Sequence, residues 1–161
     1  MDYQHLIHPF EPVYDENSEI LILGTFPSVK SRQTDFYYGH PQNRFWRVLA
    51  RLTGEEVPQS IEEKQSLLLR HRIALWDVLG SCDIRGSSDS SIRNAEPTDI
   101  RRILEAAHIR AIYANGGTAA RLYRKYQQPQ LDIPIMTLPS TSPANAGWSL
   151  DRLCAQWMVI R

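Results

Sequence analysis

One stretch constrains the fold of this chain more than any other: the four apolar residues Ile20-Leu21-Ile22-Leu23, which run directly into the turn Gly24-Thr25-Phe26-Pro27-Ser28. Four apolar residues in a row suit a strand that is covered on both faces, as strands of a parallel sheet are. In open parallel sheets, ligands bind beyond the carboxyl ends of the strands. The turn follows such an end, so we expect the functional site there.

Three more apolar segments have the length of strands, and they alternate with patterns of helical spacing. The expected strands cover residues 73–79, 111–114 and 133–138, and the expected helices cover residues 43–54, 60–70, 97–107, 117–127 and 148–161. Strands separated by helices form a parallel sheet with right-handed crossovers and helices on both faces. The sequence therefore predicts an α/β fold, a three-layer αβα sandwich around a central four-stranded parallel sheet.

Length and turn signals set the expected organisation. The 161 residues suit a single domain over residues 1–161. Residues 1–18 are rich in turn formers and predict an irregular N-terminal arm. Residues 80–96 are polar and predict the longest loop, and a long loop in a compact domain is more often functional than idle.

Charge and cysteine usage exclude several classes of protein. Lys+Arg and Asp+Glu are both 18, so there is no bulk basic field, and a polyanion would have to meet local arginine clusters. Cys82 and Cys154 have no Cys or His at metal-ligand spacing, and the five His are spread out, so we expect no zinc, iron–sulfur cluster or other metal, and no cofactor. Without a signal peptide or a run of ~20 apolar residues, the expected location is cytoplasmic and intracellular, with no membrane contact.

The residues expected near the strand ends are amides, hydroxyls and rings. There is no phosphate-binding Gly-x-x-x-x-Gly-Lys-Ser/Thr motif and no Gly-x-Ser-x-Gly nucleophile elbow. Four aspartates in these loops are scattered along the sequence, so no acid pair is expected: Asp35, Asp77, Asp83 and Asp89. Asn offers a donor and an acceptor together, which suits the edge of a planar heterocycle, and aromatic rings suit its faces. The candidates are Thr25, Phe26, Phe36, Tyr37, Tyr38, Asn43, Asn115, Ser140, Thr141, Ser142 and Asn145.

Each candidate also has a purely structural interpretation. Asn43 could cap the helix that follows it, and Asn115 could be a turn residue before Gly-Gly. Tyr37 and Tyr38 could be packing residues. A basic stripe at helical spacing could be a solvated face or a set of phosphate contacts, and it comprises Arg44, Arg47 and Arg51.

Two motifs resemble those of the uracil-DNA glycosylase superfamily. Its first motif resembles two segments of this chain separated by a spacer of ten residues: the turn at residues 24–28 and the run Gly39-His-Pro-Gln-Asn-Arg-Phe-Trp. Leu138-Pro-Ser-Thr-Ser-Pro-Ala-Asn-Ala looks like its second, the loop that enters DNA beside a flipped base. Phe26 stands where uracil-specific members have a catalytic Asn. With the Tyr-Tyr-x-His-Pro-x-Asn-x-Phe-Trp loop and Asn-Gly-Gly, this departure looks like the hypoxanthine-DNA glycosylase branch.

This resemblance implies a fold, an activity and a set of site residues. A monofunctional DNA glycosylase of base excision repair is implied, which flips a deaminated base out of DNA and hydrolyses its N-glycosidic bond without a metal. The implied catalytic residues are Asn43 and Asn115. The implied base pocket comprises Gly24, Thr25, Phe26, Pro27, Tyr38 and His40, with Tyr38 stacked on the base. The implied DNA contacts are Ser140, Thr141, Ser142, Pro143, Ala144 and Asn145. We expect a monomer associated with the nucleoid.

Three other functions remain open from the sequence. The chain could be a uracil or G·T/U mismatch glycosylase of the same superfamily. It could be a catalytically silent nucleic-acid-binding module of the same fold. It could instead hydrolyse free nucleosides, in which case it would not require polymeric DNA.

Overall fold

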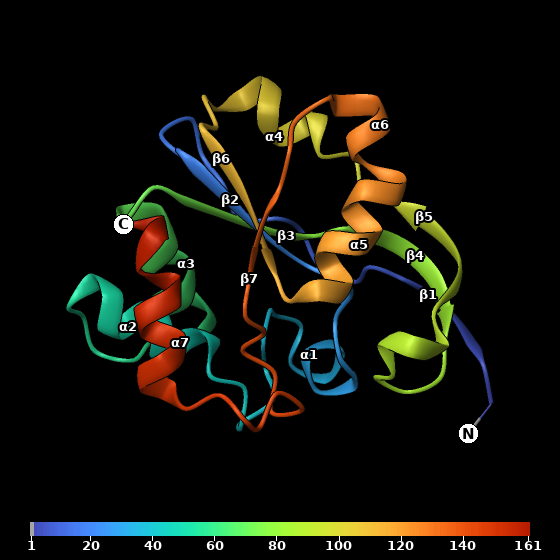
Figure 1. The fold of residues 1–161 in the computed structure, drawn as a ribbon, viewed down its shortest axis with the longest axis horizontal. Helices are drawn as coiled ribbons and strands as arrows, with labels where there is room; N and C mark the ends of the chain where they lie inside the picture. Colours follow the sequence, from blue (N-terminus) through green and yellow to red (C-terminus); the bar gives the residue numbers. More distant parts are fainter. Residues whose placement is uncertain (1) are drawn as a thin grey trace.

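The computed structural model describes residues 2–161 and contains the predicted four-stranded parallel sheet. Its strands are β2 (Ile20–Gly24), β3 (Ile73–Asp77), β6 (Ala111–Asn115) and β7 (Met136–Leu138), in the order β3-β2-β6-β7 (Figure 1). Each neighbouring pair is parallel, as crossover connections require. The α/β prediction is therefore confirmed.

Helices cover both faces of this sheet. They are α1 (Val29–Thr34), α2 (Phe45–Thr53), α3 (Ile61–Arg70), α4 (Arg101–Ala106), α5 (Gly117–Tyr126), α6 (Gln128–Leu131) and α7 (Leu150–Trp157), with 3₁₀ turns at Asp89–Ser91 and Met158–Ile160. Figure 1 shows α2, α3 and α7 on one side of the sheet and α5 and α6 on the other. This arrangement is the predicted three-layer sandwich.

β2 is one of the two inner strands of this sheet and is buried along its whole length. Leu21, Ile22 and Leu23 have no exposed surface. Burial of each such side chain contributes about 1.5–3 kcal/mol, so the apolar run is a main source of the stability of the sheet. Its carboxyl end, Gly24, is thereby held in a fixed place at the middle of the rim.

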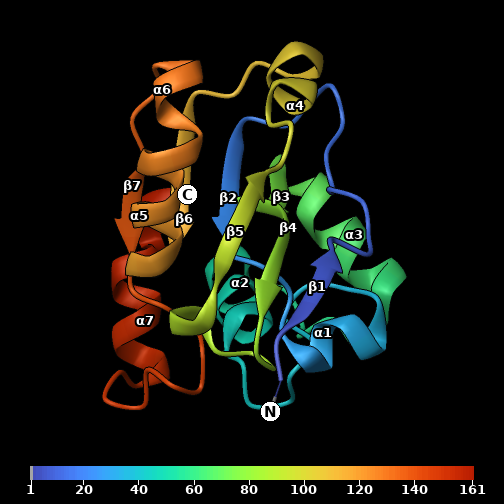
Figure 2. The same ribbon diagram turned by 90° about the vertical axis from the view of Figure 1, so that its right-hand side faces the viewer.

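A second sheet, which the sequence analysis does not predict, stands beside the first. It is antiparallel, has the order β1-β4-β5, and consists of β1 (Gln4–Ile7), β4 (Leu79–Ile84) and β5 (Arg93–Pro97) (Figure 2). The expected irregular arm therefore contains a strand, although Met1 lies outside the described residues. The expected loop over residues 80–96 is two strands with a 3₁₀ turn between them. Both predictions fail because β1 and β5 are short, mostly exposed strands without an apolar pattern.

Several helix boundaries also differ from the prediction. The helix expected near Asn43 begins at Phe45, the one expected from Pro97 begins at Arg101, and α1 was not predicted at all. The closing helix is shorter than expected, because α7 ends at Trp157 in a 3₁₀ turn. No helix within residues 2–161 is long and apolar enough to span a membrane.

Candidate active site

The carboxyl ends of three adjacent strands meet at the centre of the rim. Asp77 ends β3, Gly24 ends β2, and Asn115 ends β6. A Cβ on Gly24 would lie 2.5 Å from Oδ1 of Asp77 and 2.8 Å from the hydroxyl oxygen of Tyr38. A larger residue at this position would force one of these side chains to move, so the polar groups of Asp77 and Tyr38 lie directly over the end of β2.

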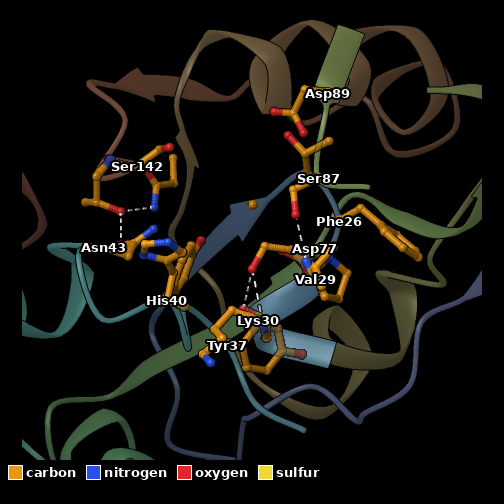
Figure 3. Close-up of a pocket in the computed structure, with 18 of the residues that line it drawn as sticks. Phe26, Val29, Lys30, Tyr37, His40, Asn43, Asp77, Ser87, Asp89 and Ser142 are labelled. Atoms are coloured by element: carbon orange, nitrogen blue, oxygen red, sulfur yellow. Dashed lines mark hydrogen bonds between the residues drawn. The ribbon is translucent and has the colours of Figure 1, made fainter. Parts of the chain in front are cut away.

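A cavity of about 430 Å³ opens at this rim, within the range of roughly 300–1,000 Å³ that is usual for small-ligand pockets. Its walls include all of the predicted pocket and catalytic residues: Gly24, Thr25, Phe26, Pro27, Tyr38, His40, Asn43 and Asn115. Figure 3 shows Asn43, His40 and Ser142 along one side and Phe26, Ser87 and Asp89 along another. The loops that follow different strands thus form one enclosure.

The two predicted catalytic asparagines are joined through the side chain of Thr141. The Thr141 hydroxyl accepts a hydrogen bond from Nδ2 of Asn115 at 3.0 Å and donates one to Oδ1 of Asn43 at 2.8 Å. Thr141 has no exposed surface and Asn115 is 9% exposed, so water competes little for these bonds. Asn43, Thr141 and Asn115 therefore form one rigid unit.

Backbone groups fix which way each amide points. The backbone N–H of Phe45 donates to Oδ1 of Asn43 at 2.9 Å, and that of Thr141 donates to Oδ1 of Asn115 at 3.0 Å. A backbone N–H can only donate, so the accepting atom must be the amide oxygen in both cases. Oδ1 of Asn43 already accepts two bonds, while its Nδ2 has no partner among residues 2–161. Asn43 therefore presents hydrogen-bond donors, and no acceptor, to the cavity.

Asn43 thus has a structural role beside any functional one. Its oxygen accepts from the backbone N–H of Phe45, the first residue of α2, but the N-cap position is Arg44, so Asn43 is not the predicted cap and lies one residue before it. Asn115 is likewise held in place by Thr141 rather than by a turn alone. These structural hydrogen bonds occupy the amide oxygen of Asn43 and leave its NH₂ group able to bind a ligand.

Arg44 holds the loop at residues 139–148 onto the site. Its guanidinium donates to the backbone oxygens of Ser142 and Asn145, each at 3.0 Å, and to that of Trp148. Its own backbone N–H donates to the oxygen of Thr141 at 3.1 Å. Arg44 is therefore neither a solvated residue nor a free phosphate ligand, whereas Arg47 is exposed on α2.

The predicted DNA contacts have different exposures. Ala144 is exposed, and four others are half-buried: Ser140, Ser142, Pro143 and Asn145. The Thr141 side chain is fully buried and bonded to both asparagines, so it does not reach a phosphate in this conformation. Four of the six also line the cavity, namely Ser140, Thr141, Ser142 and Pro143.

The two tyrosines of the aromatic loop differ in role. Tyr37 is 2% exposed and donates its hydroxyl to the backbone oxygen of Glu11 at 2.9 Å, which agrees with the packing interpretation. Tyr38 has a left-handed backbone with φ of 55° and stacks on Phe45 with ring centroids 4.1 Å apart. One face of Tyr38 is therefore already covered, and its predicted stacking on a base would require the other face.

Two carboxylates line the cavity, contrary to the expectation that the aspartates are scattered. Asp77 is 4% exposed at the strand end, while Asp89 lies at the outer edge, on the 3₁₀ turn between β4 and β5. The two aspartates have no common signal in the sequence, because the second sheet returns Asp89 toward the cavity. Crowding of protein around its carboxyl, and then the charge of Asp77, raise the pKa of Asp89 to about 6.

A buried histidine from the N-terminal segment supports Asp77. Nε2 of His8 lies 2.8 Å from Oδ2 of Asp77, and each side chain is 5% exposed. The backbone N–H of His8 donates to the oxygen of Gly80 at 2.7 Å, so the second sheet holds the histidine in place. No sequence signal marks this pair, because 69 residues separate its members.

Comparisons with known proteins agree with these features. A family model described as the uracil DNA glycosylase superfamily matches residues 11–160. A hypoxanthine DNA glycosylase of Methanosarcina acetivorans is 38% identical over 153 residues, which cover 94% of this chain and 95% of that protein. A hypoxanthine DNA glycosylase of Methanosarcina barkeri is 40% identical over 110 residues, or 66% of this chain and 69% of that protein.

A solved structure is also similar over almost the whole length. It is a solution NMR structure of a Methanosarcina acetivorans protein, provisionally named as a uracil DNA glycosylase. The two folds superpose with a TM-score of 0.81 at 36% sequence identity, over 97% of this chain and 98% of that one. The rim loops described above therefore lie on a fold that this neighbour shares.

Proposed function

This chain belongs to the uracil DNA glycosylase superfamily, and from that premise we propose that it is a DNA glycosylase that excises hypoxanthine from DNA in base excision repair. Hypoxanthine arises when adenine is deaminated. The observation that carries the proposal is the enclosed cavity at the sheet rim, where Asn43 presents two unpaired N–H groups beside aromatic walls. The curated relatives that bear this name span nearly the same length.

The substrate base must leave the duplex before it can enter the cavity. Extrusion costs a few kcal/mol, and least for a mispaired base such as hypoxanthine opposite thymine, the partner that remains when adenine is deaminated. The exposed end of the loop at residues 139–148, near Ala144, would occupy the vacated space, while Ser140 and Ser142 would contact the flanking phosphates. Because Arg44 holds this loop, we propose that the loop has its DNA-binding conformation before DNA binds.

Cleavage of the N-glycosidic bond leaves negative charge on the departing purine. Hydrogen-bond donors aimed at that charge lower the barrier. Asn43 supplies such donors through its NH₂ group. Its oxygen already accepts two hydrogen bonds, so Asn43 donates to the base and does not accept a hydrogen bond from water. Asn115 keeps one N–H beyond its bond to Thr141 and holds the unit in place. The water that attacks C1′ must therefore be oriented by other acceptors of the rim.

Specificity for hypoxanthine over uracil is favoured by the turn after β2. Phe26 lines the cavity, and it stands where the motif of uracil-specific members of the superfamily has a catalytic Asn that reads uracil and orients water. Its benzyl group can do neither, but it adds apolar surface for a purine. A uracil or G·T/U mismatch glycosylase remains the second candidate within this superfamily.

The function is tested with a panel of labelled oligonucleotides that carry hypoxanthine, uracil, xanthine or thymine opposite each base. Alkali-labile abasic sites should appear first and mainly at hypoxanthine. Faster release of uracil would favour the second candidate. Binding without release would indicate a silent DNA-binding module, and cleavage of free deoxyinosine would indicate a nucleoside hydrolase.

We expect affinity for DNA to rise as the pH falls through about 6. The raised pKa of Asp89 means that its carboxylate carries a full charge at pH 7.5 and is largely neutral at pH 5.5. A neutral group at the cavity edge repels phosphates less, which should strengthen binding roughly two- to fivefold. Titration of a fluorescent duplex at both pH values measures this effect. Asp89→Asn should bind as tightly at pH 7.5 as at pH 5.5, and a persisting pH dependence would assign the effect to another group.

A monomer associated with the nucleoid is part of the same proposal. A flipped base needs one cavity and one loop, and this chain supplies both from residues of a single copy. A substrate within DNA also implies a location where the genome is. Sedimentation at micromolar concentration would test the monomer.

A further inference from the structure

Asp77 is the most deeply placed charged group of the cavity, and the proposed chemistry leaves it unused. Its Oδ2 is held by His8, while Oδ1 accepts no hydrogen bond from residues 2–161. The side chain is 95% buried, yet Asp77 lines the cavity. Oδ1 is not among the buried polar atoms that lack a partner, so it is open to the cavity, where a ligand can supply a donor.

The surroundings of His8 fix the direction in which the carboxylate faces. His8 packs edge-on against Phe10 and Phe26, with ring centroids 4.8 and 5.9 Å away. A carboxylate can only accept, so Nε2 of His8 carries the hydrogen of the 2.8 Å bond. Rotation of Asp77 would break this bond inside an apolar shell. Oδ2 is therefore fixed, and Oδ1 is left over the end of β2.

A protonated hydroxyl stands next to that oxygen. The Tyr38 hydroxyl is buried and has no hydrogen-bond partner among the described residues. Burial, and then the charge of Asp77, raise the pKa of Tyr38 far above its usual range, so the hydroxyl keeps its hydrogen. The Tyr38 hydroxyl oxygen and Oδ1 of Asp77 thus both lie close to Gly24, where a Cβ would be 2.8 and 2.5 Å from them.

Depth decides which part of a substrate meets this pair. A flipped purine is attached to its sugar through N9, and its N1/O6 edge is the part farthest from the sugar. That edge enters the cavity first and reaches the deepest groups. Water must attack C1′ at the mouth, where Asp89 lies rather than Asp77. The position of Asp77 therefore suits recognition of the base and not activation of water.

We propose that Asp77, positioned by His8, accepts the N1–H of hypoxanthine and so separates it from adenine; this inference rests on the proposed function. Hypoxanthine presents a donor at N1 and an acceptor at O6, so its N1–H can donate to Oδ1 of Asp77. Adenine presents the opposite pattern, an acceptor at N1 and a donor at N6. Adenine would place the lone pair of its N1 against the lone pairs of the Asp77 carboxylate. The two would repel each other, so the undamaged parent base is rejected. Guanine shares the N1/O6 pattern and must be rejected at C2.

Binding to duplexes that cannot be cleaved tests this assignment directly. We would compare duplexes that carry 2′-fluoro analogues of deoxyinosine, 1-methyldeoxyinosine and deoxyadenosine. The wild-type protein should bind deoxyinosine about 10- to 100-fold more tightly than either of the others, as loss of a hydrogen bond to a charged group implies. Equal affinity for the methylated base would overturn the inference without any mutation.

Asp77→Asn is the variant that tests the same contact, because it keeps the size of the side chain and the hydrogen bond from His8. With its oxygen accepting from His8, the new amide turns its NH₂ toward the cavity, which suits N1 of adenine. The preference for deoxyinosine over deoxyadenosine should therefore shrink at least about tenfold. Asp83→Asn is the control: Asp83 also bonds a histidine, His5 at 2.8 Å, but lies outside the cavity. A thermal melt of each variant confirms that it is folded.

Excision assays on cleavable duplexes separate the remaining outcomes. If Asp77→Asn keeps the binding preference but stops release of every base, Asp77 activates water and the inference is wrong. If the wild-type protein binds deoxyinosine selectively but releases no hypoxanthine, the proposed function fails and the assignment of Asp77 stands. An unchanged preference in Asp77→Asn overturns the assignment whatever the excision rate.

Discussion

Asn43→Ala should release hypoxanthine roughly 10²–10³-fold more slowly than the wild-type protein under single-turnover conditions, the usual effect of removing one donor from a developing anion. The substitution deletes both unpaired N–H groups that face the cavity. DNA binding should largely persist, because the loop at residues 139–148 is still held by Arg44. Rates from quenched single-turnover reactions and affinities from duplex titration measure the two effects separately.

Asn43→Asp distinguishes the donor role from the structural one. A carboxylate can still accept from the Phe45 backbone and the Thr141 hydroxyl, but it has no N–H to offer and adds negative charge. It should therefore be at least as inactive as Asn43→Ala while keeping more of the stability. Asn17→Ala, at an exposed position away from the cavity, is the control. Near-normal excision by Asn43→Asp would show that Asn43 acts through its oxygen instead.

Asn115→Ala should also lose excision, since it removes both hydrogen bonds that hold Thr141 beside Asn43.

The parallel sheet can be predicted because burial leaves a direct trace in the sequence. Each of the four predicted strands matches an observed one, and β2 and β3 are buried at every position. The antiparallel sheet leaves no such trace, since β1 and β5 are mostly exposed and Asn94 in β5 has a left-handed backbone. These short strands form because β4 continues directly from β3 and offers them an edge. Pairing of this kind depends on tertiary structure rather than on local pattern.

The limits of the site prediction have the same origin. The motif residues at the ends of β2 and β6 come together as expected, since parallel strands end at one edge. His8 and Asp77 lie far apart in the sequence and meet only through the unpredicted sheet. The roles of the asparagines were also not readable, because the direction of an amide depends on which backbone N–H reaches it. Only the bond from Phe45 identifies Asn43 as a donor to the cavity.

The buried Thr141 hydroxyl tests whether the two asparagines work as one unit. Thr141→Val has nearly the same shape but removes the group that accepts from Asn115 and donates to Asn43. The buried amide of Asn115 and the half-buried amide of Asn43 then each lose a partner, which should lower the free energy of unfolding by about 1–3 kcal/mol. The Asn43 side chain also becomes free to turn, so excision should fall at least about tenfold, as it does when catalytic groups lose their alignment.

The decisive comparison is between Thr141→Val and Thr141→Ser in the same assays. Serine keeps the hydroxyl and both hydrogen bonds and loses only a methyl group, so it should excise hypoxanthine at close to the wild-type rate even if packing costs it some stability. Urea titration measures the stabilities, and single-turnover release measures the rates. If the two variants lose activity equally, the methyl group and not the hydroxyl matters, and Asn43 and Asn115 are aligned independently. If only the valine variant fails, a residue that never touches DNA in this conformation sets the position of the donor.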